Sequence, residues 1–468
     1  MFLDTLVGRL NFQPLGLLAV ATATKAAGHE VLLSDMTHPK QVFRDVEAFA
    51  PDVIAMPTTT GPHKQVLSMC ARLKSRFEFH SVIGGPHPTF FPQIALRPEV
   101  DAVCRGEADV AFVEYLNRLE HGDPSTAPNM AFERNGELVD NPPMPLIPDI
   151  DELPQTAWEI LDPHPMASRF PVRPFISTRG CPYQCSYCYN ANLQQYYKGK
   201  GKFVRRMSPG RFVSEIESYK KRAPISFVYI FDDTFAVSND WLDEFCEQYK
   251  KRIDRPFFVD FTARLVTAER IAKLQKAGLA YCGVGLESGD ETVRQEILCK
   301  KQTDEHLRNA ADVFHKAKLP FEFFSMLGLP ATDFEKDLDT FEMNRDLKPT
   351  VADVMIFQPY PGTPLGDKAK ELGLFSGDPD DLPPTFKSRS ILNFPHRDKV
   401  RRLMFLFRIL VMLGASRKTA KTLASLPLTP LYWLINRLVE GFTKSRNIYR
   451  IKVPLRDYLT TVYHFIRP

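Results

Sequence analysis

Short apolar runs alternate with amphipathic helical stretches over residues 1–125, which is the pattern of a parallel α/β sheet. Strands are predicted at Val31–Asp35, Val53–Met56, Val82–His87 and Ala102–Glu107. The intervening segments, such as Leu15–Ala27, have helical periodicity, and Gly28 suits a helix C-terminus. We therefore expect a Rossmann-like N-terminal domain.

A second series of strand-like runs starts at Phe175–Thr178. The later runs are Phe227–Phe231, Phe257–Phe261, Tyr281–Leu286, Phe321–Leu327 and Val354–Phe357. Six βα units in about 190 residues are too few for a closed barrel of eight, so we expect a partial (β/α)6 barrel of the TIM type over residues 173–368. Such sheets place their chemistry at the C-terminal strand ends. Nine prolines between residues 141 and 174 predict a linker, which we assign to residues 126–172.

Residues 369–468 are expected to form a basic, apolar helical region. From His396 onward the chain has 15 Lys and Arg against 3 Asp and Glu, or +12, whereas the remainder has 45 against 53, or −8. The apolar runs Leu403–Leu413 and Leu426–Leu438 are shorter than the ~20 residues of a membrane-spanning helix. Helices lying on an anionic membrane surface fit this pattern, and so do helices that cap the barrel or form a dimer contact.

The composition is that of a globular protein, with 44% apolar and 25% charged residues. Eight cysteines in 468 residues are not a disulfide framework, and the sequence does not open with a secretory signal pattern. Free thiols therefore favour a reducing cytoplasm.

Three of these cysteines, Cys181, Cys185 and Cys188, stand close together. Their C-x3-C-x2-C spacing can hold three irons of a cubane 4Fe–4S cluster and leave the fourth iron open to bind substrate atoms. Four-cysteine ferredoxin spacing would close that position, and structural zinc usually takes four protein ligands. The simpler interpretations are a zinc site or chance clustering.

The cysteine motif, with the aromatic Tyr187 before its last cysteine, resembles the signature of the radical S-adenosylmethionine superfamily. The resemblance implies that the open iron chelates the amino and carboxylate groups of S-adenosylmethionine. It also implies that one electron cleaves this molecule to a 5′-deoxyadenosyl radical, with a flavodoxin- or ferredoxin-type protein as the donor.

Several strand ends of the expected barrel match the same superfamily. Asp232 and Asp233 follow the second strand, where a carboxylate could bind the ammonium group of S-adenosylmethionine or merely cap the next helix. Arg264 ends the third strand and could pair the carboxylate bidentately, although a surface ion pair suits it as well. Glu287 and Ser288 follow a glycine-rich segment and are candidate ribose contacts or parts of a plain turn.

Small and hydroxylated residues stand at the strand ends of the N-terminal domain. They are Thr58-Thr59-Thr60-Gly61, Gly84-Gly85-Pro86-His87 and Gly106-Glu107. Glycines there let a sheet edge approach a large flat ligand, as in doubly wound nucleotide-binding folds. A resemblance to the cobalamin-binding domain of class B, or BchE-like, radical S-adenosylmethionine enzymes rests on four segments: Pro14-Leu15-Gly16-Leu17-Leu18, Gly28-His29-Glu30-Val31, Gly84-Gly85-Pro86-His87-Pro88-Thr89 and Gly106-Glu107. Thr58-Thr59-Thr60-Gly61 adds hydroxyls and a glycine at a neighbouring strand end. We therefore expect cobalamin contacts from Thr58, Thr59, Thr60, Gly84, Gly85 and His87.

Two features depart from that family. The Asp-x-His-x-x-Gly motif, which supplies a histidine to cobalt in methionine-synthase-like domains, is absent, and His63 and His87 lie outside that pattern. The usual first strand is missing or degenerate, because the chain starts Met1-Phe2-Leu3-Asp4. Cobalt would then lack a histidine ligand, or cobalamin would be lost altogether. His87 suits a structural role as well as a ligand contact.

We therefore expect a radical S-adenosylmethionine enzyme that uses cobalamin to methylate an unactivated carbon of a small molecule. The resemblance also allows an oxidation or ring closure of the anaerobic porphyrin cyclase kind. A non-catalytic, cluster-bearing binding or electron-transfer module is a third interpretation. The apolar basic C-terminal region favours a lipophilic substrate, such as a terpenoid lipid or a pigment, over a peptide, and peripheral contact with the inner face of the membrane. No nucleic acid partner is expected.

Overall fold

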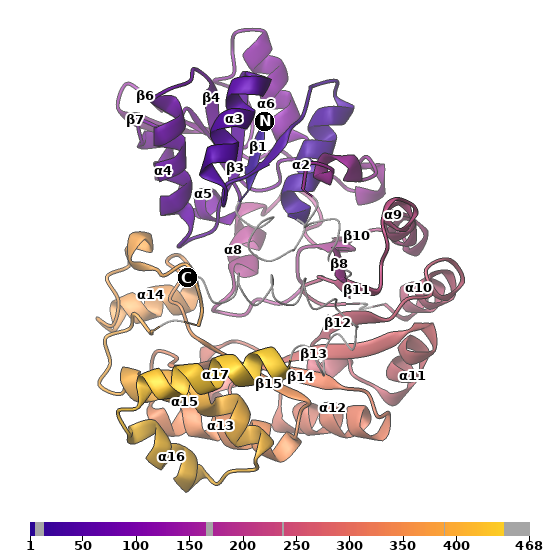
Figure 1. Cartoon of the computed structure of the whole chain (residues 1–468), viewed down its shortest axis with the longest axis vertical. Helices are drawn as coiled ribbons and strands as arrows, with labels where there is room; N and C mark the ends of the chain where they lie inside the picture. The colour runs from indigo at the N-terminus through magenta and orange to yellow at the C-terminus, as the bar shows by residue number, and fades with distance from the viewer. Residues whose placement is uncertain (5–13, 165–171, 236–237, 388, 444–468) are drawn as a thin grey trace. The chain divides into compact units, whose positions relative to one another are not determined.

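The computed structural model describes residues 1–4, 14–164, 172–235, 238–387 and 389–443 (Figure 1). These residues divide into two compact units. The first unit contains residues 1–175 and 193–224, and the second contains residues 176–192 and 225–443.

The first unit is built on a seven-stranded sheet in the order β2-β1-β3-β4-β5-β6-β7. Its strands are β1 (Phe2–Asp4), β2 (Leu33–Asp35), β3 (Val53–Pro57), β4 (His80–Gly84), β5 (Ala102–Cys104), β6 (Met130–Arg134) and β7 (Glu137–Asp140). Its helices include α2 (Leu15–Ala26), α3 (Pro39–Phe49), α4 (His63–Lys74), α5 (Pro86–Phe90), α6 (Ala111–Glu120) and α9 (Pro209–Arg222). Strands β1 to β5 pair in parallel, so the predicted Rossmann-like pattern is confirmed.

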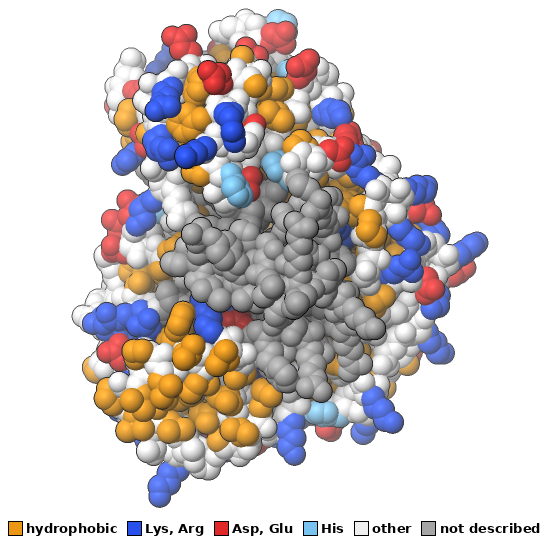
Figure 2. Space-filling model, viewed as in Figure 1, with side chains coloured by type: hydrophobic (Ala, Val, Ile, Leu, Met, Phe, Trp, Pro, Cys, Tyr) orange, Lys and Arg blue, Asp and Glu red, His pale blue; other side chains and the backbone are white. Residues whose placement is uncertain are grey.

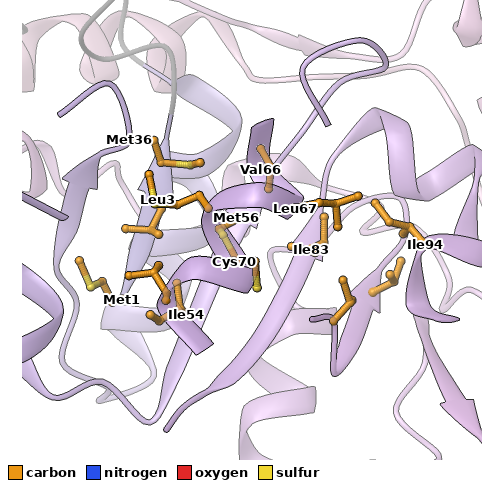
Figure 3. Close-up of a cluster of buried hydrophobic side chains, with 14 of the residues drawn as sticks. Met1, Leu3, Met36, Ile54, Met56, Val66, Leu67, Cys70, Ile83 and Ile94 are labelled. Carbon is orange, nitrogen blue, oxygen red and sulfur yellow. The ribbon is translucent and has the colours of Figure 1, made fainter. Parts of the chain in front are cut away.

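The first strand, expected to be missing or degenerate, is present as the short strand β1. It is only three residues long, yet it lies between β2 and β3, with Phe2 paired to both Leu33 and Ala55. Leu3 is fully buried and joins a core cluster that fills the space between the sheet and α4 (Figure 3). Figure 3 labels ten members of this cluster: Met1, Leu3, Met36, Ile54, Met56, Val66, Leu67, Cys70, Ile83 and Ile94.

The hairpin β6–β7 extends the sheet by two antiparallel strands that were not predicted. Its two turn residues, Asn135 and Gly136, have φ of 55° and 82°. This left-handed pair suits a two-residue hairpin turn, because its twist matches that of the flanking strands.

A six-stranded sheet follows in the order β15-β14-β13-β12-β11-β8. Its strands are β8 (Val172–Phe175), β11 (Phe227–Ile230), β12 (Phe257–Phe261), β13 (Leu279–Glu287), β14 (Phe321–Leu327) and β15 (Val351–Ile356). The helices that alternate with strands β11 to β15 are α10 (Asn239–Arg252), α11 (Ala268–Ala277), α12 (Asp304–Lys316) and α13 (Phe334–Leu347), and α14 (Pro364–Glu371) follows β15. Strands β11 to β15 are parallel, and the expected partial barrel is confirmed.

Three helices complete the described chain: α15 (Arg397–Met412), α16 (Arg417–Ser425) and α17 (Thr429–Thr443). The first predicted apolar run belongs mainly to α15, whose apolar side chains pack against β15 and α13. This run therefore caps the barrel, which was one of the two interpretations of its sequence. Among the described helices, none is both long and apolar enough to cross a bilayer.

Candidate functional site

The cysteine motif lies on the loop between β9 (Thr178–Arg179) and α8 (Tyr189–Tyr196), and Asp232 holds the start of this loop. One Asp232 oxygen accepts hydrogen bonds from the backbone N–H groups of Ser177, at 2.6 Å, and Thr178, at 3.1 Å. Its other oxygen accepts the Ser177 hydroxyl. Asp232 is only 2% exposed, so these bonds occupy a carboxylate that water does not reach.

Ser186 fixes the middle of the loop. Its N–H donates to the Leu298 carbonyl at 3.0 Å, and its hydroxyl donates to the Ile297 carbonyl at 2.6 Å. Its own carbonyl accepts the Leu365 N–H at 2.9 Å. The loop is thus held by backbone that follows β13 and backbone that follows β15.

The three cysteines are free thiols, with Cys181 buried and Cys185 and Cys188 half-buried. Burial raises the pKa of each thiol, and that of Cys185 to about 11. The backbone N–H and side-chain amide of Asn190 both point at the Cys188 sulfur, at 3.5 and 3.7 Å, and act in the opposite direction. A metal that binds these sulfurs must therefore supply the positive charge that keeps them ionised.

Asp233 differs from Asp232 because its side chain is exposed beside the motif. Its Oδ2 accepts a hydrogen bond at 3.1 Å from the Asn190 amide, the same amide that contacts Cys188. The structure therefore divides the predicted acidic pair: Asp232 supports the loop, and Asp233 is available to a ligand.

Glu287 lies at the end of β13 and is tied to the cysteine loop. Its Oε1 accepts hydrogen bonds from the Tyr187 hydroxyl at 3.1 Å and from the Lys300 ammonium at 2.8 Å. Glu287 has φ of 66°, and the pairing of β13 with β14 shifts register there. A non-glycine residue in this region is strained, a condition common at functional sites. Sequence reasoning missed Lys300, because a lysine in a connecting segment has no distinguishing pattern.

Gly285, two residues before Glu287, has no side chain because the Lys300–Glu287 ion pair fills the space beside it. A Cβ at Gly285 would collide with both Lys300 Nζ and Glu287 Oε1. The space predicted for a ligand beside Gly285 is thus occupied by this ion pair.

The other two predicted contacts in the barrel are placed differently. Ser288 is 1% exposed, and its backbone carbonyl accepts a hydrogen bond from Arg294 at 2.7 Å, as expected of a structural turn. Arg264 is exposed, and its charge acts on the phenol of Tyr183, a residue of the cysteine motif.

Asp260, on β12, is a second residue that sequence reasoning missed. Within the described residues, its Oδ1 is buried and has no hydrogen-bond partner. Burial and the nearby Asp232 and Asp233 raise the pKa of Asp260 to about 8, so its carboxyl group is mainly protonated at neutral pH.

The first unit brings its predicted residues together after β3 and β4. The Thr58 N–H donates to the Gly84 carbonyl at 2.8 Å, and the Thr58 carbonyl accepts the His87 N–H at 3.1 Å. Thr58, Thr60 and His87 are buried beneath this edge of the sheet, whereas Thr59 is exposed and Gly84 and Gly85 are half-buried. The exposed positions are small, which suits the approach of a flat ligand.

The two histidines of this edge form a stacked pair. The rings of His63 and His87 lie 3.9 Å apart at 15°, and Thr60 Oγ1 is 3.2 Å from His87 Nδ1. The Gly61 N–H donates to His63 Nδ1 at 3.1 Å, so the neutral His63 ring carries its proton on Nε2.

No group of three or more His, Cys, Asp or Glu side chains in the described parts of the chain could hold a metal ion. The cysteines of a cubane cluster bind separate irons, so they need not converge on one point. Three free thiols on one anchored loop, with a hydrogen-bonded sulfur at Cys188 and a nearby cation at Lys300, fit such a cluster.

Comparisons with known proteins agree with both sites. The B12 binding domain family matches residues 5–116, and the radical SAM superfamily matches residues 175–342. An uncharacterized methyltransferase of Pyrococcus horikoshii is 28% identical over 373 residues, covering 76% of this chain and 78% of the relative. The anaerobic magnesium-protoporphyrin IX monomethyl ester cyclase of Rubrivivax gelatinosus is 25% identical over 386 residues, covering 78% of this chain and 67% of the cyclase.

Among solved structures, the radical S-adenosylmethionine methyltransferase TsrM of Kitasatospora setae, with cobalamin and a 4Fe–4S cluster bound, superposes with a TM-score of 0.64. It is 16% identical, and the match covers 80% of this chain and 75% of TsrM. At this identity the likeness shows the shared fold.

The chain belongs to the cobalamin-dependent radical S-adenosylmethionine enzymes, as the residues of both units predicted. The cofactors of its two domains are a 4Fe–4S cluster, S-adenosylmethionine and cobalamin. The match to the B12 binding domain family favours retained cobalamin over its loss, and β1 supplies the first strand of this domain.

Proposed function

We propose that the protein methylates an unactivated carbon of a lipophilic small molecule. The observation that carries this proposal is the joint presence of a B12 binding domain and a radical SAM domain in a chain similar to a methyltransferase over three quarters of its length. When bound, the cluster and S-adenosylmethionine supply hydrogen abstraction after one-electron cleavage, and cobalamin supplies the methyl group.

The second unit contributes the residues that hold and orient S-adenosylmethionine. Cys181, Cys185 and Cys188 would each hold one iron, which leaves the fourth iron for the amino and carboxylate groups of S-adenosylmethionine. Asp233, exposed beside Cys188, is positioned to bind the ammonium group by a charge-assisted hydrogen bond. Arg264 is the proposed partner of the carboxylate.

The first unit contributes a surface for the corrin ring. Thr59, Gly84 and Gly85 would contact it, whereas Thr58, Thr60 and His87 would support that surface from beneath through the hydrogen bonds between the two loops. We expect no histidine ligand to cobalt, because the Asp-x-His-x-x-Gly motif is absent from the sequence.

A second candidate function is oxidative ring closure, and the similarity to the Rubrivivax gelatinosus cyclase favours it. The mass of the product separates the two functions. Methylation adds one CH2 to the substrate, whereas oxidation removes hydrogen or inserts oxygen.

We also propose that the enzyme contacts the membrane through an apolar C-terminal patch. We define this patch by eight exposed side chains: Met412, Leu413, Leu426, Leu428, Leu431, Trp433, Leu434 and Leu438. Figure 2 shows hydrophobic side chains gathered over the face where α17 lies in Figure 1. Leu431, Leu434 and Leu438 recur at helical spacing, which places them on one face of α17.

The net positive charge around the patch is smaller than the +12 counted from the sequence, because several basic side chains are in ion pairs. Arg408 pairs with Asp353, Lys421 pairs with Glu335, and Arg417 pairs with three acidic side chains of α13. Each basic group near an anionic leaflet adds ~1 kcal/mol, so the pairing weakens the attraction. We therefore expect apolar insertion to contribute more to membrane binding than charge, with Arg437, which lies over the Trp433 ring, at the rim.

Co-sedimentation with vesicles of mixed phosphatidylcholine and phosphatidylglycerol tests this contact. Wild type should pellet at low salt and, in part, at high salt, whereas Leu431→Glu/Leu434→Glu should stay in solution. Leu372→Glu is the matched control, because Leu372 is 44% exposed, close to the 49% of Leu431 and Leu434, but lies outside the patch. Wild-type protein that stays in solution at low salt would overturn this part of the proposal.

We place the enzyme in a reducing cytoplasm, with an electron donor of flavodoxin or ferredoxin type. The three free thiols and an oxygen-sensitive cluster support this placement.

The function is tested by feeding the reconstituted enzyme a lipid extract together with S-adenosylmethionine that carries a CD3 group. A lipid that gains one CD3 in place of hydrogen supports methylation. Label-free products that have lost hydrogen or gained oxygen would replace it with the oxidative function.

A further inference from the structure

Lys300 forms an ion pair with Glu287 at the cysteine loop. Its ammonium donates to the Gly285 carbonyl at 2.7 Å and to Glu287 Oε1 at 2.8 Å. The two side chains are only 14% and 12% exposed. Burying two charges costs more free energy than their attraction commonly returns, so a pair of this kind is weak support for stability. A role in the site is a better account of it.

The ion pair is connected to the metal-binding loop on two sides. Glu287 accepts the hydroxyl of Tyr187, which lies between Cys185 and Cys188 in the chain. The backbone just before Lys300 accepts both hydrogen bonds of Ser186 through the carbonyls of Ile297 and Leu298. One short segment therefore both shapes the loop and delivers a cation to it.

Glu287 Oε1 joins the Lys300 ammonium to the Tyr187 hydroxyl, because it accepts a hydrogen bond from each. The Lys300 charge is therefore held at the cysteine loop, one hydrogen-bonded side chain away from Tyr187.

We propose that Lys300 is a positioning residue that fixes a positive charge at the cysteine loop and thereby raises the reduction potential of the cluster. This inference rests on the proposed function. Reduction adds one electron to an already anionic group of iron, sulfide and thiolate, and a buried cation nearby favours the reduced form. Net charge and hydrogen bonding are the levers by which proteins set such potentials.

The test is a dithionite redox titration of the reconstituted full chain, followed by electron paramagnetic resonance of the reduced cluster. Lys300→Met should disfavour reduction about tenfold, which is 59 mV for a one-electron couple. Lys300→Arg keeps the charge and should restore most of this loss. Lys301→Met is the matched control, because Lys301 is the exposed neighbour in sequence, and it should titrate as wild type.

Two further variants separate charge from loop shape. Glu287→Gln removes the anion but keeps an acceptor for Tyr187 and Lys300, so it should shift the potential in the opposite direction. Tyr187→Phe removes only the hydroxyl and should leave the potential near that of wild type. If Lys300→Met fails to bind a cluster, the Glu287→Gln titration decides the question.

Equal potentials for Lys300→Met and Lys301→Met would overturn the inference, as would an unshifted potential in Glu287→Gln. A Tyr187→Phe shift equal to that of Lys300→Met would show that the effect comes from loop position rather than charge. A wild-type chain that binds no cluster would instead mean that the proposed function has failed.

Discussion

Replacing Gly85 with alanine should destabilise the first unit, because the backbone there has φ of 96° and ψ of −170°. This region is essentially restricted to glycine, and another residue in it costs about 1–3 kcal/mol. The added Cβ would also lie 2.9 Å from the Thr58 carbonyl oxygen and 3.1 Å from the Thr58 nitrogen. Thr58 cannot move away freely, since it is hydrogen-bonded to Gly84 and His87.

Crowding of this kind adds about 1–3 kcal/mol, so the unfolding free energy should fall by about 2–6 kcal/mol in total. For a unit of this size the midpoint of thermal unfolding should drop by at least about 4 °C. Cobalamin affinity should fall as well, because the loops after β3 and β4 would separate, while iron content should be unchanged.

Amide hydrogen exchange on a temperature series measures this effect unit by unit, with peptides from β3 and β4 compared with peptides from β12 to β14. Gly84→Ala is the matched control, because its Cβ would come no closer than 3.7 Å to the Cys104 carbonyl oxygen, an ordinary contact. If Gly85→Ala and Gly84→Ala lose protection at the same temperature as wild type, the strain argument is wrong.

The remaining predictions concern acidic residues of the second unit. Asp232→Ala should lose iron, because three hydrogen bonds at the start of the cysteine loop disappear. Asp233→Ala should keep its iron but bind S-adenosylmethionine about 10- to 100-fold more weakly, because it loses one hydrogen bond between charged groups. Iron analysis and equilibrium binding measure these two effects. Equal iron loss in Asp232→Ala and Asp233→Ala would contradict the division of roles. Burial raises the pKa of Asp337 to about 7, so the folded chain keeps a proton that the unfolded chain releases above about 4. Unfolding free energy should therefore fall as pH rises from about 4 to 7, by up to ~1.4 kcal/mol per pH unit from this group, and urea unfolding of Asp337→Asn should lack that component.

Much of the fold could be predicted from hydrophobic periodicity, because buried parallel strands are nearly continuous apolar runs. The strand β1 could not, since three residues at the start of a chain have no periodicity, and only their pairing with β2 and β3 identifies them. The hairpin β6–β7 had a usable signal in Asn135-Gly136, which favours a tight turn between strands.

Some residues of the site could be predicted from the sequence and others could not. Cys181, Cys185 and Cys188 are local in sequence, so their spacing alone indicated a cluster. Lys300 and Asp260 could not be predicted, because what marks them is their contact with residues distant in sequence. Lys300, for example, binds Glu287, which is 13 positions away.

The two apolar runs of the C-terminal region show that sequence pattern alone does not predict which apolar helix is buried. Both are apolar enough in sequence to suit a membrane surface, yet α15 is buried against β15 and α13 while several large side chains of α17 are exposed. Tertiary packing, rather than composition, decides which of them is available to a membrane.

The central claim is that the three cysteines bind a cluster that cleaves S-adenosylmethionine by one-electron reduction. The most direct measurement is the amount of 5′-deoxyadenosine formed by the anaerobically reconstituted, dithionite-reduced protein, in wild type, in Cys185→Ala and in Cys246→Ala, whose cysteine lies on α10 outside the motif. We predict 5′-deoxyadenosine from wild type and Cys246→Ala and none from Cys185→Ala. Full iron content with continued cleavage in Cys185→Ala, or no cleavage by a cluster-replete wild type, would contradict the account.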